Sequence, residues 1–136
     1  MENNLVTRLH EYITELLPWA HGHQIKAMAD FVAAIIDKQT ANQAELARSL
    51  GNQEAATRRL SRLLHNQRLS PKDLAEAIFA AVLAQLPHRG KLRLAIDWTI
   101  EGDHHLLVVS LVTGARALPI YWRAYSARAL KGSMAR

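Results

Sequence analysis

Apolar residues follow a helical pattern through the first two thirds of the chain. They recur at steps of three and four from residue 5 to residue 86, which places them on one face of successive helices. The pattern predicts five helices, the first ending before Pro18 and the last spanning residues 71–86. The second, residues 24–37, is expected to bury six apolar side chains: Ile25, Met28, Ala29, Val32, Ile35 and Ile36.

The pattern changes to that of strands after Gly90. Residues 92–99 form a nearly continuous apolar run, which predicts a central strand covered on both faces. Turn residues then separate two further runs, 104–112 and 116–122, so we expect an antiparallel meander. Pro119 cannot donate to a neighbouring strand, which indicates that the third strand lies at an edge. The sequence therefore predicts an α+β fold, with a helical region at 1–89 and a strand region at 90–136.

Composition narrows the class of protein. The chain is 49% hydrophobic and 21% charged, as in a globular protein. It has no cysteine, which excludes disulfides and thiolate zinc sites. No apolar stretch approaches the roughly 18–20 residues of a membrane span, and the polar first residues are unlike a signal peptide. We therefore expect a cytoplasmic protein without a membrane partner.

The third and fourth predicted helices have the spacing of a helix-turn-helix. Their sequence, QAELARSLGNQEAATRRLSRLL, places small Ala47 where two helices approach and Gly51 at a tight turn. Positive charge is concentrated here, since residues 43–93 hold nine basic and four acidic side chains. We expect Arg58, Arg59 and Arg62 to contact double-stranded DNA. The alternative is an ordinary α-hairpin with a solvated basic face.

Asp97 is the one carboxylate within the apolar run of residues 92–99. A charged carboxylate in apolar surroundings requires a compensating cation or donor. Asp97 is therefore either a metal ligand or a structural anomaly. The histidine pairs His21/His23 and His104/His105 are weaker metal candidates, because no third ligand has suitable spacing.

These motifs together resemble a known family. AIDWT on the first strand, followed by an antiparallel pair ending in GARALPIYW, is similar to the start of the catalytic domain of IS4-family DDE transposases. The basic helical region resembles that family's N-terminal DNA-binding region. The resemblance implies a ribonuclease H-like fold and maps the first Asp of the Asp-Asp-Glu triad onto Asp97. It also implies transposon ends as the DNA partner and Mg²⁺ or Mn²⁺ as the cofactor.

The resemblance further implies that the chain is an N-terminal fragment. The family's second Asp motif and its tyrosine–arginine–glutamate–lysine signature are both absent from the 136 residues. One Asp cannot hold two metal ions, so we expect no catalysis by this chain alone. An alternative is a stand-alone helix-turn-helix regulator. A further possibility is compatible with a transposase fragment. In it, the chain pairs with the full-length transposase or with itself and inhibits transposition. We also expect the strand half to expose an open apolar sheet edge.

Overall fold

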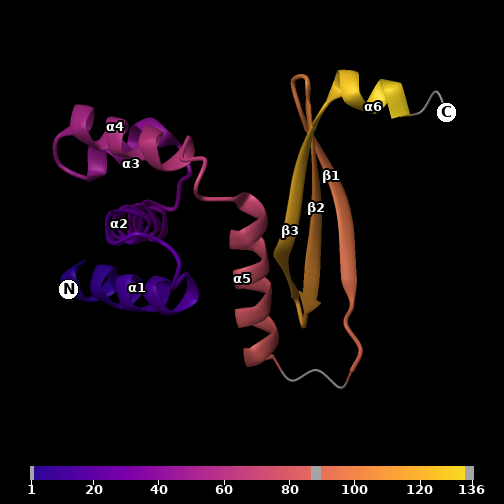
Figure 1. Cartoon of the computed structure of the whole chain (residues 1–136), viewed down its shortest axis with the longest axis horizontal. Helices are drawn as coiled ribbons and strands as arrows, with labels where there is room; N and C mark the ends of the chain where they lie inside the picture. Colours follow the sequence, from indigo (N-terminus) through magenta and orange to yellow (C-terminus); the bar gives the residue numbers. More distant parts are fainter. Residues whose placement is uncertain (1, 87–89, 134–136) are drawn as a thin grey trace. The chain divides into compact units, whose positions relative to one another are not determined.

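The chain has an α+β fold, as predicted. The computed structural model describes residues 2–86 and 90–133 (Figure 1). Within them the elements follow in the order α1 (Glu2–Leu16), α2 (Gly22–Lys38), α3 (Gln43–Ser49), α4 (Gln53–Leu64), α5 (Pro71–Gln85), β1 (Leu94–Glu101), β2 (His104–Thr113), β3 (Arg116–Ser126) and α6 (Ala127–Ser133). None of these described helices is both long and apolar enough to cross a membrane.

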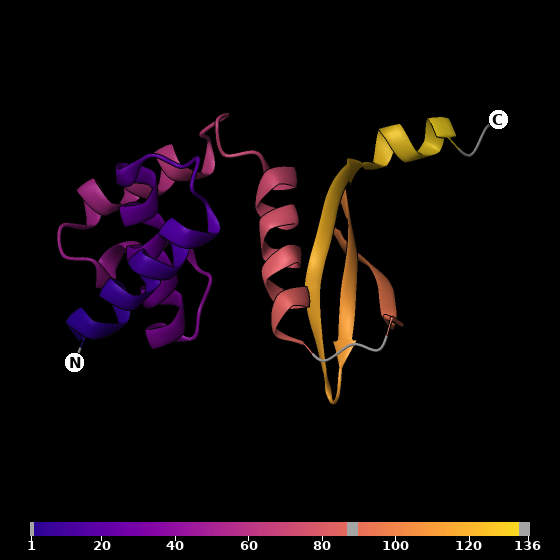
Figure 2. The same ribbon diagram turned by 60° about the horizontal axis from the view of Figure 1, so that its bottom comes forward.

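The chain forms two compact units, Met1–Ser70 and Pro71–Arg136. This boundary differs from the expected division at 89/90, because α5 belongs with the strands and lies along β3 (Figure 2). Ala75 of α5 is buried, as is Ile120 of β3. The apolar face of α5 therefore packs against β3.

A sixth helix, α6, is present in addition to the five predicted. It begins after Ser126, whose Oγ accepts a hydrogen bond from the Ala129 N–H. It has only seven residues and no clear apolar period, so the hydrophobic pattern did not predict it. A serine before a short helix is the usual capping residue and was the available signal.

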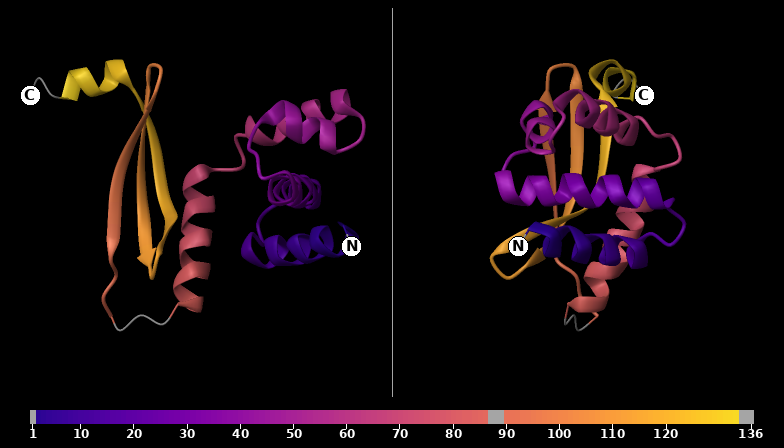
Figure 3. Two further views of the ribbon diagram at one scale, coloured as in Figure 1. Left: turned by 180° about the vertical axis from the view of Figure 1, so that it is seen from behind. Right: turned by 90° about the vertical axis from the view of Figure 1, so that its left-hand side faces the viewer.

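The first unit is built around α2. Helix α1 packs against one side of α2, and α3 and α4 contact another (Figure 3). The predicted buried face of α2 is correct at Ile25 and Ala29 but wrong in its second half. Val32, Ile35 and Ile36 are exposed there, and the residues buried in their place are Phe31, Ala33 and Ala34. A helix with neighbours on two sides does not keep a single apolar stripe, which is why the prediction failed.

The second unit contains an open antiparallel sheet in the order β1-β2-β3. Its meander and the edge position of β3, which carries Pro119, are as predicted. The prediction that the first strand is central and covered was wrong, whereas the open apolar sheet edge expected of the strand half is present at β1. Strand β1 lies at the other edge, and all eight of its residues are exposed. Strand β2 is the middle strand and includes the buried Leu111. The β1 sequence has the composition of a buried strand, but the described residues do not cover it.

Candidate nucleic-acid interface and the setting of Asp97

The connection between α3 and α4 is short and locally determined. Asn42 caps α3 by accepting hydrogen bonds from two backbone N–H groups, and Asn52 caps α4 by accepting one from Ala55. Between the helices, Gly51 has a φ of +88°, a conformation that side-chain-bearing residues rarely adopt. The sequence itself therefore fixes where α3 ends and α4 begins.

The angle between α3 and α4 is filled by a small apolar cluster. Leu46 of α3 and Leu60 of α4 are buried against Phe31 and Ala34 of α2. Ala47, which the sequence placed at the close approach of two helices, is fully buried. The cluster fixes one face of α4 against α2 and leaves the opposite face exposed.

Two of the three arginines expected to contact DNA lie on this exposed face. Arg58 and Arg62 are one helical turn apart, and the Nε of Arg62 donates to the carbonyl oxygen of Arg58. Arg58 forms an ion pair with Glu54, in which both side chains are more than 70% exposed. Such an exposed pair contributes about 0–1 kcal/mol and yields readily to a competing anion. Among the described residues no carboxylate pairs with Arg62.

The third arginine, Arg59, is partly buried and contacts α2. Its guanidinium forms an ion pair with Asp30 of α2 and lies 5.9 Å from the centre of the Phe31 ring. The side chains of Arg59 and Asp30 are 36% and 17% exposed. A guanidinium with these contacts joins α4 to α2 and is poorly placed to bind a phosphate. We therefore assign Arg59 to packing.

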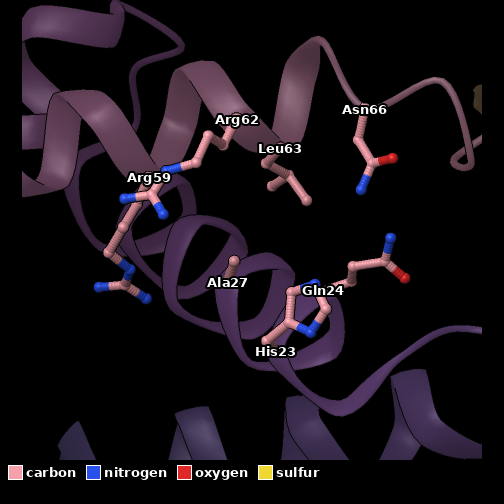
Figure 4. A pocket seen from close by; sticks show the side chains of 7 residues that line it. All are labelled: His23, Gln24, Ala27, Arg59, Arg62, Leu63 and Asn66. Carbon is pink, nitrogen blue, oxygen red and sulfur yellow. The ribbon is translucent and has the colours of Figure 1, made fainter.

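A pocket of about 390 Å³ lies between α2 and the second half of α4 (Figure 4). Arg59, Arg62 and Leu63 line it from α4 and Asn66 from the following turn, while His23, Gln24 and Ala27 line it from α2. Gln24 is buried, and its Oε1 accepts a hydrogen bond from the backbone N–H of His21. The pocket adds polar groups beside Arg62. The pocket could not be predicted from local sequence, because His23 and Arg62 are 39 residues apart along the chain.

Asp97 lies on the exposed edge strand β1, opposite Val108 of β2. Its Oδ1 accepts a hydrogen bond of 2.8 Å from the backbone N–H of Trp98. The carboxylate is solvated here, so the desolvation cost that made it stand out in the sequence is absent. Its one described partner is a neutral backbone donor.

The groups around Asp97 do not fit a magnesium site. Mg²⁺ requires several oxygen ligands in near-octahedral geometry. In the part of the chain that the structure describes, no three His, Asp or Glu side chains converge on a possible metal position. The histidine pairs also lack a third ligand among the residues that the structure describes. His21 and His23 stack with ring centroids 5.8 Å apart, and His105 contacts Trp98 edge-on.

The Asp30–Arg59 pair is expected to stabilise the first unit more than the Glu54–Arg58 pair. A double-mutant cycle with Asp30→Ala and Arg59→Ala should give a coupling free energy of about 1 kcal/mol, since the pair is partly shielded from water. The same cycle with Glu54→Ala and Arg58→Ala should give about 0.3–0.5 kcal/mol, as for an exposed helical pair. Urea denaturation measures both. Equal couplings would contradict the assignment of Arg59 to packing.

Comparison with protein-family models, curated proteins and solved structures gave no match to the chain. The support for a nucleic-acid interface therefore comes from the geometry and charge of the residues described above.

Proposed function

We propose that the chain binds double-stranded DNA through the exposed face of α4, as the DNA-end-binding part of a DDE transposase. In this proposal α3 and α4 form a helix-turn-helix, and α4 is the recognition helix in the major groove. Arg58 and Arg62 contact phosphates or a guanine edge. The observation that carries the proposal is the exposed Arg58/Arg62 pair on a helix whose other face is fixed by a buried core.

The neighbouring groups support the same surface. Arg62 lies at a pocket that also presents His23, Gln24 and Asn66, which are side chains able to donate to phosphate oxygens (Figure 4). A second, shallower hollow is lined by Gln53, Glu54, Thr57 and Arg58 at the start of α4. Polar side chains at the start of a recognition helix are the ones that reach base edges.

The transposase assignment depends on the strand motifs. AIDWT with GARALPIYW has no role in a DNA-binding regulator of the helix-turn-helix class, so this pair favours a transposase over that alternative. In the complete enzyme, Asp97 would be one ligand of a Mg²⁺ or Mn²⁺ ion that assists phosphodiester cleavage. The described residues offer no second ligand near Asp97, and the proposal for this chain is therefore limited to DNA binding.

A salt titration tests the proposed DNA binding. The chain is expected to bind a fluorescently labelled duplex, with the association constant falling as salt rises. Two phosphate contacts alone predict a slope of log K against log salt of about −1.8. Fluorescence anisotropy titrations at a series of salt concentrations, from low to physiological, give the slope. Absence of binding, or binding with no salt dependence, would contradict the proposal.

A further inference from the structure

Two side-chain amides of the pocket between α2 and α4 have orientations fixed by hydrogen bonds. The Oε1 atom of Gln24 accepts a 2.9 Å hydrogen bond from the backbone N–H of His21. The Oδ1 atom of Asn66 accepts a 3.0 Å hydrogen bond from the backbone N–H of Arg68. Because each oxygen is turned to a backbone donor, the position of each NH₂ group follows. Figure 4 shows the two amide nitrogens turned toward each other across the pocket.

The NH₂ group of Gln24 requires an acceptor that the described part of the chain does not supply. Gln24 is 4% exposed, and its one hydrogen bond to a described residue is made by its oxygen. A buried donor without an acceptor is destabilising. A water molecule in the pocket would relieve this cost, and an anion would do so more strongly, because charged acceptors form stronger hydrogen bonds.

The charges around the pocket favour an anion. None of the described residues that line it carries a carboxylate, and Arg62 lines it as a cation. The other lining cation, Arg59, is paired with Asp30. Gln24 also lies in the first turn of α2, which contains no acidic residue. The start of this 17-residue helix carries partial positive charge, and this charge adds to the attraction for an anion.

We propose that the NH₂ groups of Gln24 and Asn66 together hold one phosphate of a DNA backbone. This rests on the proposed function, because the phosphate belongs to the duplex bound along α4. In Figure 4 the Arg62 guanidinium lies toward Arg59 and away from the two amides, so Arg62 contacts a neighbouring phosphate. The two amides thereby fix the register of α4 on the duplex, as uncharged phosphate contacts do.

The side-chain NH₂ signals of the unsubstituted chain test the site directly by NMR. In an isotope-labelled chain, those of Gln24 and Asn66 should shift when inorganic phosphate is added and when a duplex is added. The NH₂ signals of Gln39 and Asn42, at the end of α2 and the start of α3, should stay unchanged. Sodium chloride at equal ionic strength controls for screening.

Two results of this titration would overturn the proposal. Duplex binding that leaves the Gln24 and Asn66 signals unchanged would do so, while DNA binding through α4 would still stand. A shift with inorganic phosphate and none with the duplex would do so as well, because the pocket would then hold a free phosphate.

Two isosteric substitutions remove the proposed donors and keep the existing acceptors. Gln24→Glu and Asn66→Asp retain the oxygen that accepts from the backbone, and each replaces the NH₂ group by an oxygen that repels phosphate. Each should weaken duplex binding by about tenfold or more, as expected for the loss of a hydrogen bond to a charged group. Asn66 is only partly buried, so Asn66→Asp gives the result even if a carboxylate at the buried position 24 lowers stability.

Asn42→Asp is the matched control for these substitutions. It adds the same charge, and its oxygen still accepts the backbone N–H groups that cap α3. Its effect on duplex affinity should stay below about threefold, because a separate surface charge is screened. Equal weakening by Asn66→Asp and Asn42→Asp would overturn the proposal. An unsubstituted chain that binds no duplex would contradict the proposed function and this proposal with it.

Discussion

Replacing Leu60 by alanine is expected to lower the free energy of unfolding of the first unit by about 2–5 kcal/mol. Leu60 is 7% exposed and lies in the cluster that joins α2, α3 and α4. The substitution removes apolar contacts of α4 with α2 and with α3. It also leaves a cavity, because the three packed helices can collapse onto it only in part. Urea denaturation followed by far-UV circular dichroism measures the loss.

Leu64→Ala is the matched control, because it makes the same truncation one turn further along α4. Leu64 is 57% exposed and lies outside the cluster, so its replacement should cost less than about 1 kcal/mol. A similar loss for both variants would mean that α4 does not pack through the Leu60 face. The assignment of its outer face to DNA would then have no structural basis.

The double variant Arg58→Ala/Arg62→Ala is expected to weaken duplex binding by about 10- to 100-fold at physiological salt. This corresponds to roughly 1.4–2.8 kcal/mol, the range for losing one or two charged hydrogen bonds. The slope of log K against log salt should become shallower by about 1.8. Both side chains lie on the exposed face of α4, so the unit should remain folded.

Arg8→Ala/Lys26→Ala serves as the control for net charge. It removes two positive charges from exposed positions on α1 and α2 and leaves α4 intact. Its effect on affinity should be less than about threefold, because unbound surface charges are screened at physiological salt. If both double variants lose affinity equally, binding follows overall charge and the α4 surface has no special role.

The ends of helices and strands that local residues determine were predicted from the sequence. Pro18, Gly51 and the turn residues between the strands mark the ends of elements, and their effect does not depend on distant neighbours. The burial of α2 and β1 was mispredicted because it depends on what packs against them. Phe31 and Val32 are both apolar, and only the positions of α3 and α4 decide which is buried.

In the candidate site, too, local spacing was predictable and tertiary contacts were not. The spacing of Arg58 and Arg62 on one helical face follows from their sequence separation. The inward position of Arg59 does not, because its partner Asp30 lies 29 residues away. Asp97 stands out in the sequence as a carboxylate in an apolar run, but its solvation follows from the edge position of β1, which the local sequence does not encode.

Mapping the DNA contact on the protein tests the central claim most directly. An NMR titration of the full chain with an unlabelled duplex should shift the amides of α4 and the side-chain signals of Arg58 and Arg62. The signals of Arg59 should change little, and those of β1 to β3 should stay unchanged. Shifts confined to the sheet, or no shifts at duplex concentrations well above that of the protein, would contradict the proposal that this chain binds DNA through α4.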